Sequence, residues 1–332
     1  MNRSRVLVAM SGGVDSSVAA ALLVEAGHHV TGVTMKLWGG RTESGCCSVA
    51  DVEDARRVAD QLGVAHYVFN FADDFEARVV RPYVDGHASG RTPNPCVDCN
   101  RTMKFGRLLD RAGALGFDAV ATGHHARVRG GPDRGYRLLR GVDRAKDQSY
   151  VLHGLGQPEL ARTLLPIGEL TKAEVRAVAD RLGLRTAAKP ESMDLCFVAR
   201  GDRARFLGER LPPRPGPVVD VDGRVLGDHD GIAGFTVGQR RRLGVAVGER
   251  RFVVDVDAAT ATVVLGRRED LLRSEFPVGD LSFVAGPPPG TGPCSRRCGP
   301  TESPSPPRSR STVGAAASCD PSRSSPGSPR GR

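Results

Sequence analysis

The hydrophobic residues of the first two hundred positions follow two alternating patterns. Short continuous apolar runs, which are typical of strands buried on both faces of a sheet, cover residues 6–10, 29–35, 66–69 and 118–122. Helical spacing occupies the segments 16–26 and 48–62 and the stretches after Arg101 and Thr171. This alternation predicts an α/β fold in which a parallel sheet carries helices on both faces and binds ligands at the carboxyl ends of its strands.

Residues that cap helices mark two of the predicted helix boundaries. Ser48 precedes the second helical segment and Gly63 follows it. Thr171-Lys-Ala-Glu174 has the sequence of a capping box, in which the first and last side chains each bond a backbone N–H of the other residue. We therefore expect helices to begin directly after Ser48 and Thr171.

The pattern changes after Arg205. Short apolar runs between glycine-rich turns, such as 252–256 and 262–265, predict a smaller β-rich domain. Beyond Val284 there is no Leu, Ile, Phe, Met, Trp or Tyr, so this tail cannot form a packed core. We predict an α/β domain over residues 1–205, a β-rich domain over 206–270, and a C-terminal segment over 271–332 that is of low complexity from about residue 285.

The formal net charge of +9 adds little to this organisation. Seven arginines against Glu302 and Asp320 place +5 of it in residues 285–332, which leaves +4 for the rest of the chain. A mild positive charge is compatible with an RNA partner, although phosphate binding depends on local clusters rather than on totals. No apolar run approaches the roughly 18 residues of a membrane span, and the N-terminus is too short in apolar residues for a signal peptide. We expect a cytoplasmic protein with no membrane partner.

Ser11-Gly12-Gly13 ends the first predicted strand and carries the strongest chemical signal. A strand that enters a helix through such a loop presents backbone N–H groups and hydroxyls where the helix favours an anion. The loop matches neither GxxxxGK[ST] nor GxGxxG. Asp15 would repel a phosphate unless a divalent cation lay between them, which indicates a contact to Mg²⁺ bound with a polyphosphate. The alternative is a plain glycine turn with an aspartate cap.

SGGVDS, residues 11–16, resembles the pyrophosphate-binding loop of the PP-loop ATPases, which adenylate a substrate and release pyrophosphate. Argininosuccinate synthetase, the GMP and NAD synthetases and several tRNA-sulfurating enzymes share that loop. Further motifs separate these enzymes: TPNPCVDCN at 92–100, MKF at 103–105, ATGHHAR at 121–127, KDQSY at 146–150, ESMDLCF at 191–197 and GIAGFTVGQRR at 231–241. In this order they resemble the motifs of the tRNA-specific 2-thiouridylases, over about the first 280 residues.

The resemblance implies a two-stage reaction on tRNA. ATP, with Mg²⁺, would adenylate O2 of uridine 34 in the anticodon, and sulfur would then displace AMP. In the family, the cysteine matching Cys196 receives sulfur as a persulfide from a cysteine desulfurase or a sulfur-relay protein. The cysteine matching Cys99 is the second catalytic thiol, assigned as nucleophile, and can form a disulfide with the first. A persulfide suits this step because it is acidic and strongly nucleophilic, whereas an ordinary thiol is mostly protonated near neutral pH.

The resemblance also implies roles for individual residues. The ATP-contacting positions are Ala9, Met10, Ser11, Gly12, Gly13, Val14, Asp15, Ser16, Met35 and Gly123. The positions that meet the target base are Asn94, Pro95 and Cys96, and the other tRNA contacts are His124, Lys146, Asp147 and Gln148. Cys96 departs from the family, whose other members carry an aspartate there as a candidate acid or base. Either that carboxylate is dispensable or Asp98 replaces it.

The C-terminal segment is the larger departure. The family continues with a β-barrel that adds tRNA contacts, including an Arg-Tyr pair, whereas residues 271–332 contain no tyrosine. After Ala285 the sequence resembles a GC-rich gene translated in the wrong frame. A genuine basic, disordered, RNA-binding tail is the alternative.

Other interpretations stay open from the sequence alone. Cys96 and Cys99 could be half of a zinc site with Cys46 and Cys47, but such a site would lack an obvious histidine partner or a second CxxC, and we expect no metal held by protein ligands alone. Cys196 could be an inert buried thiol. A PP-loop ligase that forms a C–N bond would need neither Cys99 nor Cys196, and a non-catalytic remnant would bind tRNA without modifying it.

Overall fold

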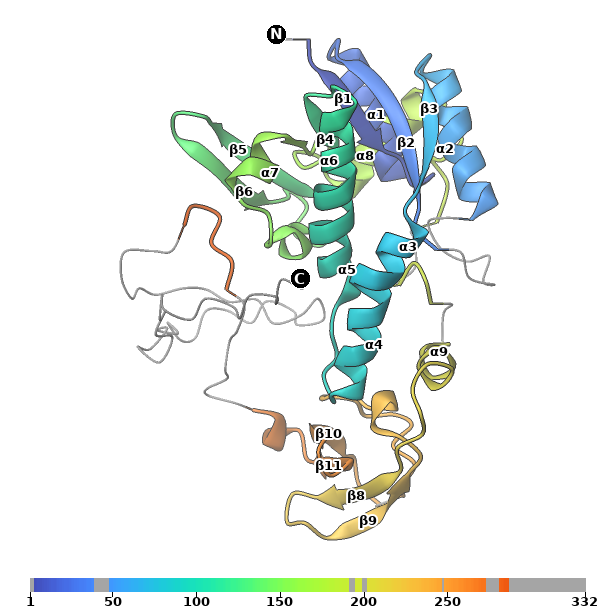
Figure 1. Cartoon of the computed structure of the whole chain (residues 1–332), viewed down its shortest axis with the longest axis vertical. Coiled ribbons are helices and arrows are strands. Elements are labelled where there is room, and N and C mark those ends of the chain that lie inside the picture. The colour runs from blue at the N-terminus through green and yellow to red at the C-terminus, as the bar shows by residue number, and fades with distance from the viewer. Residues whose placement is uncertain are drawn as a thin grey trace, which may run out of the picture.

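The computed structural model of the chain describes residues 3–38, 48–190, 195–198, 202–246, 248–272 and 281–286. Two units are visible in Figure 1: an α/β unit built around a sheet, and a smaller β-rich unit at the opposite end of the long axis. Within the described segments, no helix has both the length and the apolar character needed to cross a membrane.

A five-stranded parallel sheet organises the first unit. Its strands are β1 (Arg5–Ala9), β2 (His29–Lys36), β3 (His66–Asn70), β4 (Ala119–Ala121) and β7 (Thr163–Leu164), in the order β3-β2-β1-β4-β7. All four pairings are parallel, and Val8 of β1 lies opposite Gly32 of β2 on one side and Ala121 of β4 on the other. The predicted parallel α/β fold is confirmed, and the four predicted runs correspond to β1 to β4.

The side chains of β1 alternate between the two faces of the sheet, as strand geometry requires. Val6 and Val8 join one core with α1 (Val14–Glu25), α2 (Val49–Gln61) and α8 (Lys172–Arg181). Leu7 joins the core on the other face. Both faces are therefore covered, which explains why the strands appear in the sequence as continuous apolar runs.

Both helix caps predicted from the sequence are present. Ser48 Oγ accepts a hydrogen bond from the backbone N–H of Asp51 at the start of α2. Thr171 and Glu174 form the capping box at the start of α8. Because these caps satisfy N–H groups that no carbonyl of the same helix reaches, they determine where the two helices begin.

Two longer helices, each with a π-helical segment, cover the second face. One consists of α3 (Ala72–Phe75), η1 (Glu76–Val80) and α4 (Arg81–Ala88), and the other of α5 (Pro95–Asp98), η2 (Cys99–Arg107) and α6 (Leu108–Ala114). Buried side chains from both helices join Leu7 in a single core. The second helix begins earlier than the helical spacing after Arg101 predicts, because Asn94 and Pro95 start it.

An antiparallel hairpin, β5 (Ala126–Gly131) and β6 (Gly135–Arg140), follows β4 and lies beside α7 (Gln157–Ala161) (Figure 1). Its apolar side chains form a separate small core with η3 (Ser149–Leu152) and α7. Val284 of the segment 281–286 joins this core, and its carbonyl accepts a hydrogen bond from Gln157 Nε2 at 2.6 Å. The sequence pattern did not predict this hairpin.

The second unit contains α9 (Arg203–Gly208) and a four-stranded sheet in the order β10-β11-β8-β9. The strands are β8 (Gly216–Asp220), β9 (Val225–His229), β10 (Phe252–Asp257) and β11 (Thr262–Gly266), with the short helices η4 (Ile232–Gly234) and η5 (Glu269–Leu271). The second unit has its own hydrophobic core. Thr92 Oγ1 donates to Thr236 Oγ1 at 3.2 Å between the units. The predicted small β-rich domain is present, whereas the tail beyond residue 286 lies outside the described residues.

Candidate active site

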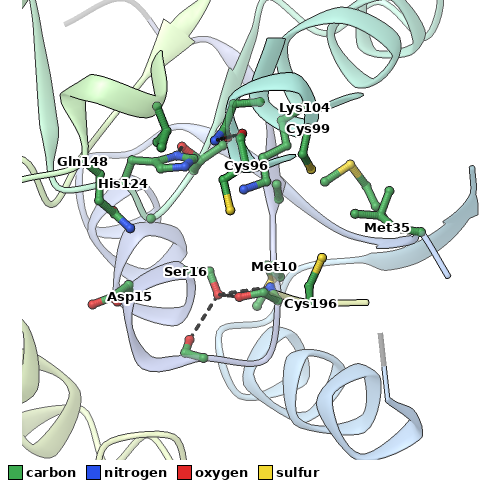
Figure 2. Close-up of a pocket in the computed structure, with 18 of the residues that line it drawn as sticks. Met10, Asp15, Ser16, Met35, Cys96, Cys99, Lys104, His124, Gln148 and Cys196 are labelled. Carbon is green, nitrogen blue, oxygen red and sulfur yellow. Dashed lines mark hydrogen bonds between the residues drawn. The ribbon is translucent and has the colours of Figure 1, made fainter. Parts of the chain in front are cut away.

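A cavity of about 420 Å³ opens at the carboxyl ends of β1, β2 and β4, where this type of sheet binds ligands. Its walls come from segments far apart in the sequence: the loop after β1 with the first turn of α1, the end of β2, α5 with the start of η2, the residues after β4, and the segment around Cys196. Figure 2 shows side chains from these segments around one space. Every site residue predicted from the sequence lines this cavity except Gly12, Asn94 and Asp147.

The loop between β1 and α1 brings the start of a helix to the cavity wall. Gly13 is the N-cap residue of α1 and has no side chain with which to cap it. The hydroxyls of Ser16 and Ser17 donate to the Gly13 carbonyl at 3.1 and 2.9 Å, and Ser16 Oγ accepts the backbone N–H of Ser11 at 3.2 Å, so these hydroxyls hold the turn. A Cβ added to Gly13 would meet only Ser11 Oγ, at 3.6 Å. The backbone at Gly13 therefore borders open space at the positive end of a helix, which suits a phosphate.

Gly12 lies behind this loop and packs against the start of α2. Its φ is +70°, and an added Cβ would lie 2.2 Å from the carbonyl oxygen of Asp51. Lys189 Nζ donates to the Gly12 carbonyl at 2.9 Å and to the carboxylates of Asp51 and Asp54 at 2.6 and 2.7 Å. Burial lowers the pKa of Lys189, but its hydrogen bonds to the two carboxylates raise it more, so the ammonium stays charged. These contacts hold the loop from the side opposite the cavity.

Asp15, predicted to contact Mg²⁺, is paired with two cationic or ionisable side chains. Its two carboxylate oxygens each lie 2.7 Å from Lys172 Nζ, and Oδ1 lies 3.4 Å from His125 Nε2. Burial raises the pKa of Asp15, but the hydrogen bonds from His125 and Lys172 and the charge of Lys172 lower it further than burial raises it. Asp15 is therefore ionised at neutral pH, and a metal ion that bound its oxygens would displace the Lys172 ammonium.

The donor set fits a magnesium ion that arrives with a polyphosphate. Among the residues that the structure describes, no group of three or more His, Cys, Asp or Glu side chains is arranged to hold a metal. Mg²⁺ commonly takes one or two carboxylates and completes its shell with phosphate and water oxygens. A single ionised aspartate beside a phosphate loop is sufficient for such an ion.

Three cysteines line the cavity, and all three are reduced. Cys99, the first residue of η2, is buried in the same core as Met35, whereas Cys96 and Cys196 are half-buried. In Figure 2 the side chains of Cys96 and Cys196 point into the space from opposite walls. Cys46 and Cys47, which the zinc interpretation requires, lie outside the described residues, as do residues 191–194 of the motif before Cys196.

The turn before Cys99 is shaped by Asn94. Its side-chain oxygen accepts the backbone N–H of Cys96 at 3.0 Å, which caps α5 and turns Cys96 toward the cavity. Asp98, the alternative acid or base, instead accepts a hydrogen bond from Arg101 at 3.0 Å and is not among the described residues that line the cavity. Of the two residues considered for an acid or base role, Cys96 therefore lines the cavity and Asp98 does not.

The residues after β4 are packed closely against α1. A Cβ on Gly123 would lie 2.6 Å from the backbone of Asp15 and Ser16, so only glycine fits there. His124 is buried, and its Nδ1 lies 2.7 Å from Thr122 Oγ1. Burial, together with the nearby charge of Lys104, holds the pKa of His124 well below its usual value. The ring is therefore neutral and can exchange hydrogen bonds with a base at neutral pH.

The KDQSY motif supplies three cavity residues, Lys146, Gln148 and Tyr150, and one support. Lys146 and Gln148 line the cavity, and Gln148 Oε1 accepts the N–H of His125 at 2.9 Å. Asp147 is only 5% exposed, and its carboxylate accepts backbone hydrogen bonds from Gly141 and from Ser149, both at 3.1 Å. Its place is beneath the surface, where it holds the loop that carries Lys146 and Gln148.

The sequence did not identify three basic residues of the wall: Lys104, His125 and Lys172. Lys172 had one detectable signal, because it occupies the first position of a helix, where the helix dipole disfavours a cation unless an anion is near. Lys104 lies in the MKF motif, but nothing local in the sequence indicates that its side chain reaches the cavity.

Comparisons with known proteins agree with this geometry. Residues 4–200 match the family description "tRNA methyl transferase HUP domain", and residues 204–267 match "tRNA methyl transferase PRC-barrel domain". The tRNA-specific 2-thiouridylase MnmA of Roseiflexus sp. (strain RS-1) is 50% identical over 306 residues, which cover 85% of this chain and 82% of the relative. That of Chloroflexus aurantiacus (strain J-10-fl) is 52% identical over 292 residues, covering 86% and 81%. That of Carboxydothermus hydrogenoformans is 50% identical over 293 residues, covering 86% and 80%. The chain belongs to the tRNA-specific 2-thiouridylase family.

Proposed function

We propose that this protein catalyses the ATP-dependent 2-thiolation of uridine 34 in the tRNA anticodon, in the cytoplasm. The observation that carries the proposal is the single cavity of about 420 Å³ that contains both a phosphate-binding loop and three reduced cysteines. A loop for phosphate alone would fit many ligases. Thiols in the same cavity place a sulfur donor next to the site where a base oxygen would be activated.

In the first step the uracil O2 attacks the α-phosphorus of ATP, an O–P bond forms, and the bond to pyrophosphate breaks. Backbone N–H groups at Gly13 to Ser16 bind the phosphates, while Met35 and Gly123 border the nucleoside. Mg²⁺, held by Asp15 and phosphate oxygens, would supply positive charge to the leaving pyrophosphate. Pro95 and Cys96 form the wall that meets the base, with Asn94 capping their helix. Lys146, Gln148 and His124 hold the surrounding RNA, and Asp147 supports the loop of Lys146 and Gln148.

In the second step the terminal sulfur of a Cys196 persulfide attacks C2 and AMP leaves. The Cys99 thiolate then attacks the Cys196 sulfur, which forms a disulfide and leaves the outer sulfur on the base as C=S. A dithiol reductant restores the two thiols. The exposures of the two cysteines suit these roles. Half-buried Cys196 is accessible to a cysteine desulfurase or sulfur-relay protein, whereas Cys99, at 8% exposed, is shielded from such a donor and reacts within the cavity.

The test is mass analysis of anticodon nucleosides after incubating tRNA with the protein, ATP, Mg²⁺ and a desulfurase with labelled cysteine. Cys196→Ser should take up no sulfur label, whereas Cys99→Ser should become labelled and still fail to thiolate tRNA. Both variants should release pyrophosphate, because the phosphate loop acts before the thiols. Label on Cys99 alone would reverse the two roles. A nucleoside that gains nitrogen instead of sulfur, formed equally by the double serine variant, would indicate a C–N ligase, and binding of tRNA without any product would indicate a non-catalytic protein.

A further inference from the structure

The β5–β6 hairpin has one apolar face and one arginine-rich face. Val128 lies opposite Leu138, and both pack into the small core beneath the hairpin. The alternate positions carry Arg127 and Arg129 on β5 and Arg137 on β6. Because side chains alternate along a strand, these three arginines lie on the face turned away from that core.

Arg129 lies directly opposite Arg137 in the ladder, and both residues are exposed. Like charges at opposed positions destabilise a hairpin. Glu169 offsets part of the charge, since its carboxylate accepts hydrogen bonds from Arg127 Nη1 at 3.2 Å and from Arg129. Residues 126–140 contain five arginines against Asp133 alone; of these, Arg140 lies on the other face, 4.0 Å from Asp147, which leaves Arg137 and the turn residue Arg134 beside the pair that Glu169 contacts. Such an arrangement opposes stability and indicates that an anion binds across the hairpin.

The hairpin extends from the rim of the active cavity. The chain enters it from His125 and returns through Lys146 and Gln148, and all three residues line the cavity. Figure 1 shows the hairpin projecting away from the sheet beside α7. A six-residue strand is about 20 Å long, which spans several nucleotides of a polymer but far exceeds a single nucleotide. The anion that fits this position is a polymer, one unit of which enters the cavity.

We propose that the arginine face of the hairpin binds the sugar–phosphate backbone of tRNA beside the nucleotide that enters the cavity. This inference rests on the proposed action on tRNA. Guanidinium groups donate paired hydrogen bonds to phosphate oxygens, so Arg129 and Arg137 together clamp the backbone from both strands. Contacts of this kind fix the orientation of a nucleic acid without reading its sequence. The hairpin therefore aligns the RNA, and the cavity selects the base.

The test is the affinity of the whole protein for an unmodified tRNA transcript, measured by fluorescence anisotropy over a series of salt concentrations. Arg129→Gln/Arg137→Gln should weaken binding about 10- to 30-fold at low salt and reduce the slope of log K against log salt by about 1.4 to 1.8. The control is Arg56→Gln/Arg57→Gln, which removes the same charge from exposed positions of α2 and should change affinity less than about threefold.

Glu169→Gln works in the opposite direction. It releases Arg127 and Arg129, so we expect tRNA to bind about three- to fivefold more tightly, a gain that misfolding cannot produce. Equal affinity of the wild type and the hairpin variant, or an equal loss in the α2 control, overturns the inference. The inference is also overturned if the hairpin variant binds tRNA as the wild type does but no longer binds anionic phospholipid vesicles. A wild-type protein with no affinity for tRNA would remove the proposed function itself.

Discussion

Replacing Gly12 by alanine tests how the phosphate loop keeps its shape. At a φ of +70° any residue with a Cβ costs about 1–2 kcal/mol more than glycine. The new Cβ would also lie 2.2 Å from the Asp51 carbonyl oxygen, so α2 and the loop must move apart. Overpacking of this kind costs a further amount of about 1–3 kcal/mol. We expect Gly12→Ala to lower the free energy of unfolding by about 2–5 kcal/mol.

Gly63→Ala is the matched control. Gly63 has nearly the same φ, +69°, but an added Cβ there has nothing within 4 Å. Its cost is therefore the backbone term alone, about 1–2 kcal/mol. Thermal unfolding separates the two variants, because each kcal/mol shifts the Tm of a domain this size by about 2–4 °C. Equal shifts would refute the contact with Asp51, and with it the account of how α2 and Lys189 hold the loop.

Three further predictions follow from the cavity and the helices around it. Gly13→Ala should keep the wild-type Tm, since its Cβ meets only Ser11 Oγ at 3.6 Å. The same variant should weaken ATP binding, measured by calorimetry, at least about tenfold. Unchanged affinity for ATP would show that the phosphates do not bind at this loop. Lys172→Met should raise the pKa of Asp15, followed by carboxyl NMR, and lower stability by about 1–2 kcal/mol because the pair is only partly buried; an unmoved Asp15 titration would contradict this. His87, buried in α4, has its pKa lowered to about 4 by burial and by Arg203, so the folded state favours the neutral ring. His87 should therefore leave stability unchanged above pH 6.5 and lower it by about 1.4 kcal/mol per pH unit from there down to pH 4. His87→Phe should remove that contribution and leave the contribution of His124, whose pKa is also lowered; an equal slope in the wild type and the variant would disprove the role of His87.

Local signals account for the parts of the fold and site that the sequence predicted. The strands were visible because both faces of the sheet are covered, which makes Val6, Leu7 and Val8 equally apolar. Caps at Ser48 and Thr171 depend on neighbouring residues alone, so the sequence contains all that is needed to find them. The loop at Ser11 to Ser16 is likewise contiguous, and its chemistry can be inferred without knowing the fold.

Features that depend on tertiary packing were not predicted. Lys172 reaches Asp15 only because α8 lies beside α1, and 157 residues separate the pair. The hairpin escaped detection because arginines alternate with its few apolar residues, as at Arg127-Val128-Arg129, and charged positions lower the apparent strand signal. Asp147 shows a different limit. A motif identifies residues that matter together, but burial decides which of them meet a ligand and which support the loop.

The π-helical segment that begins at Cys99 affects which deletions the gene can tolerate. A π segment corresponds to an α-helix with one residue inserted, and one residue of an α-helix turns the chain by about 100°. Deleting a single codon within residues 99–107 would remove that insertion and yield a regular helix, so Pro95 to Cys99 would keep nearly the same faces relative to α6. A codon lost from α6 itself has no insertion to absorb, and it would rotate Cys96 and Cys99 by about 100° away from the cavity. Over evolutionary time this helix should therefore tolerate a one-residue deletion in its π segment more readily than one in its α-helical part.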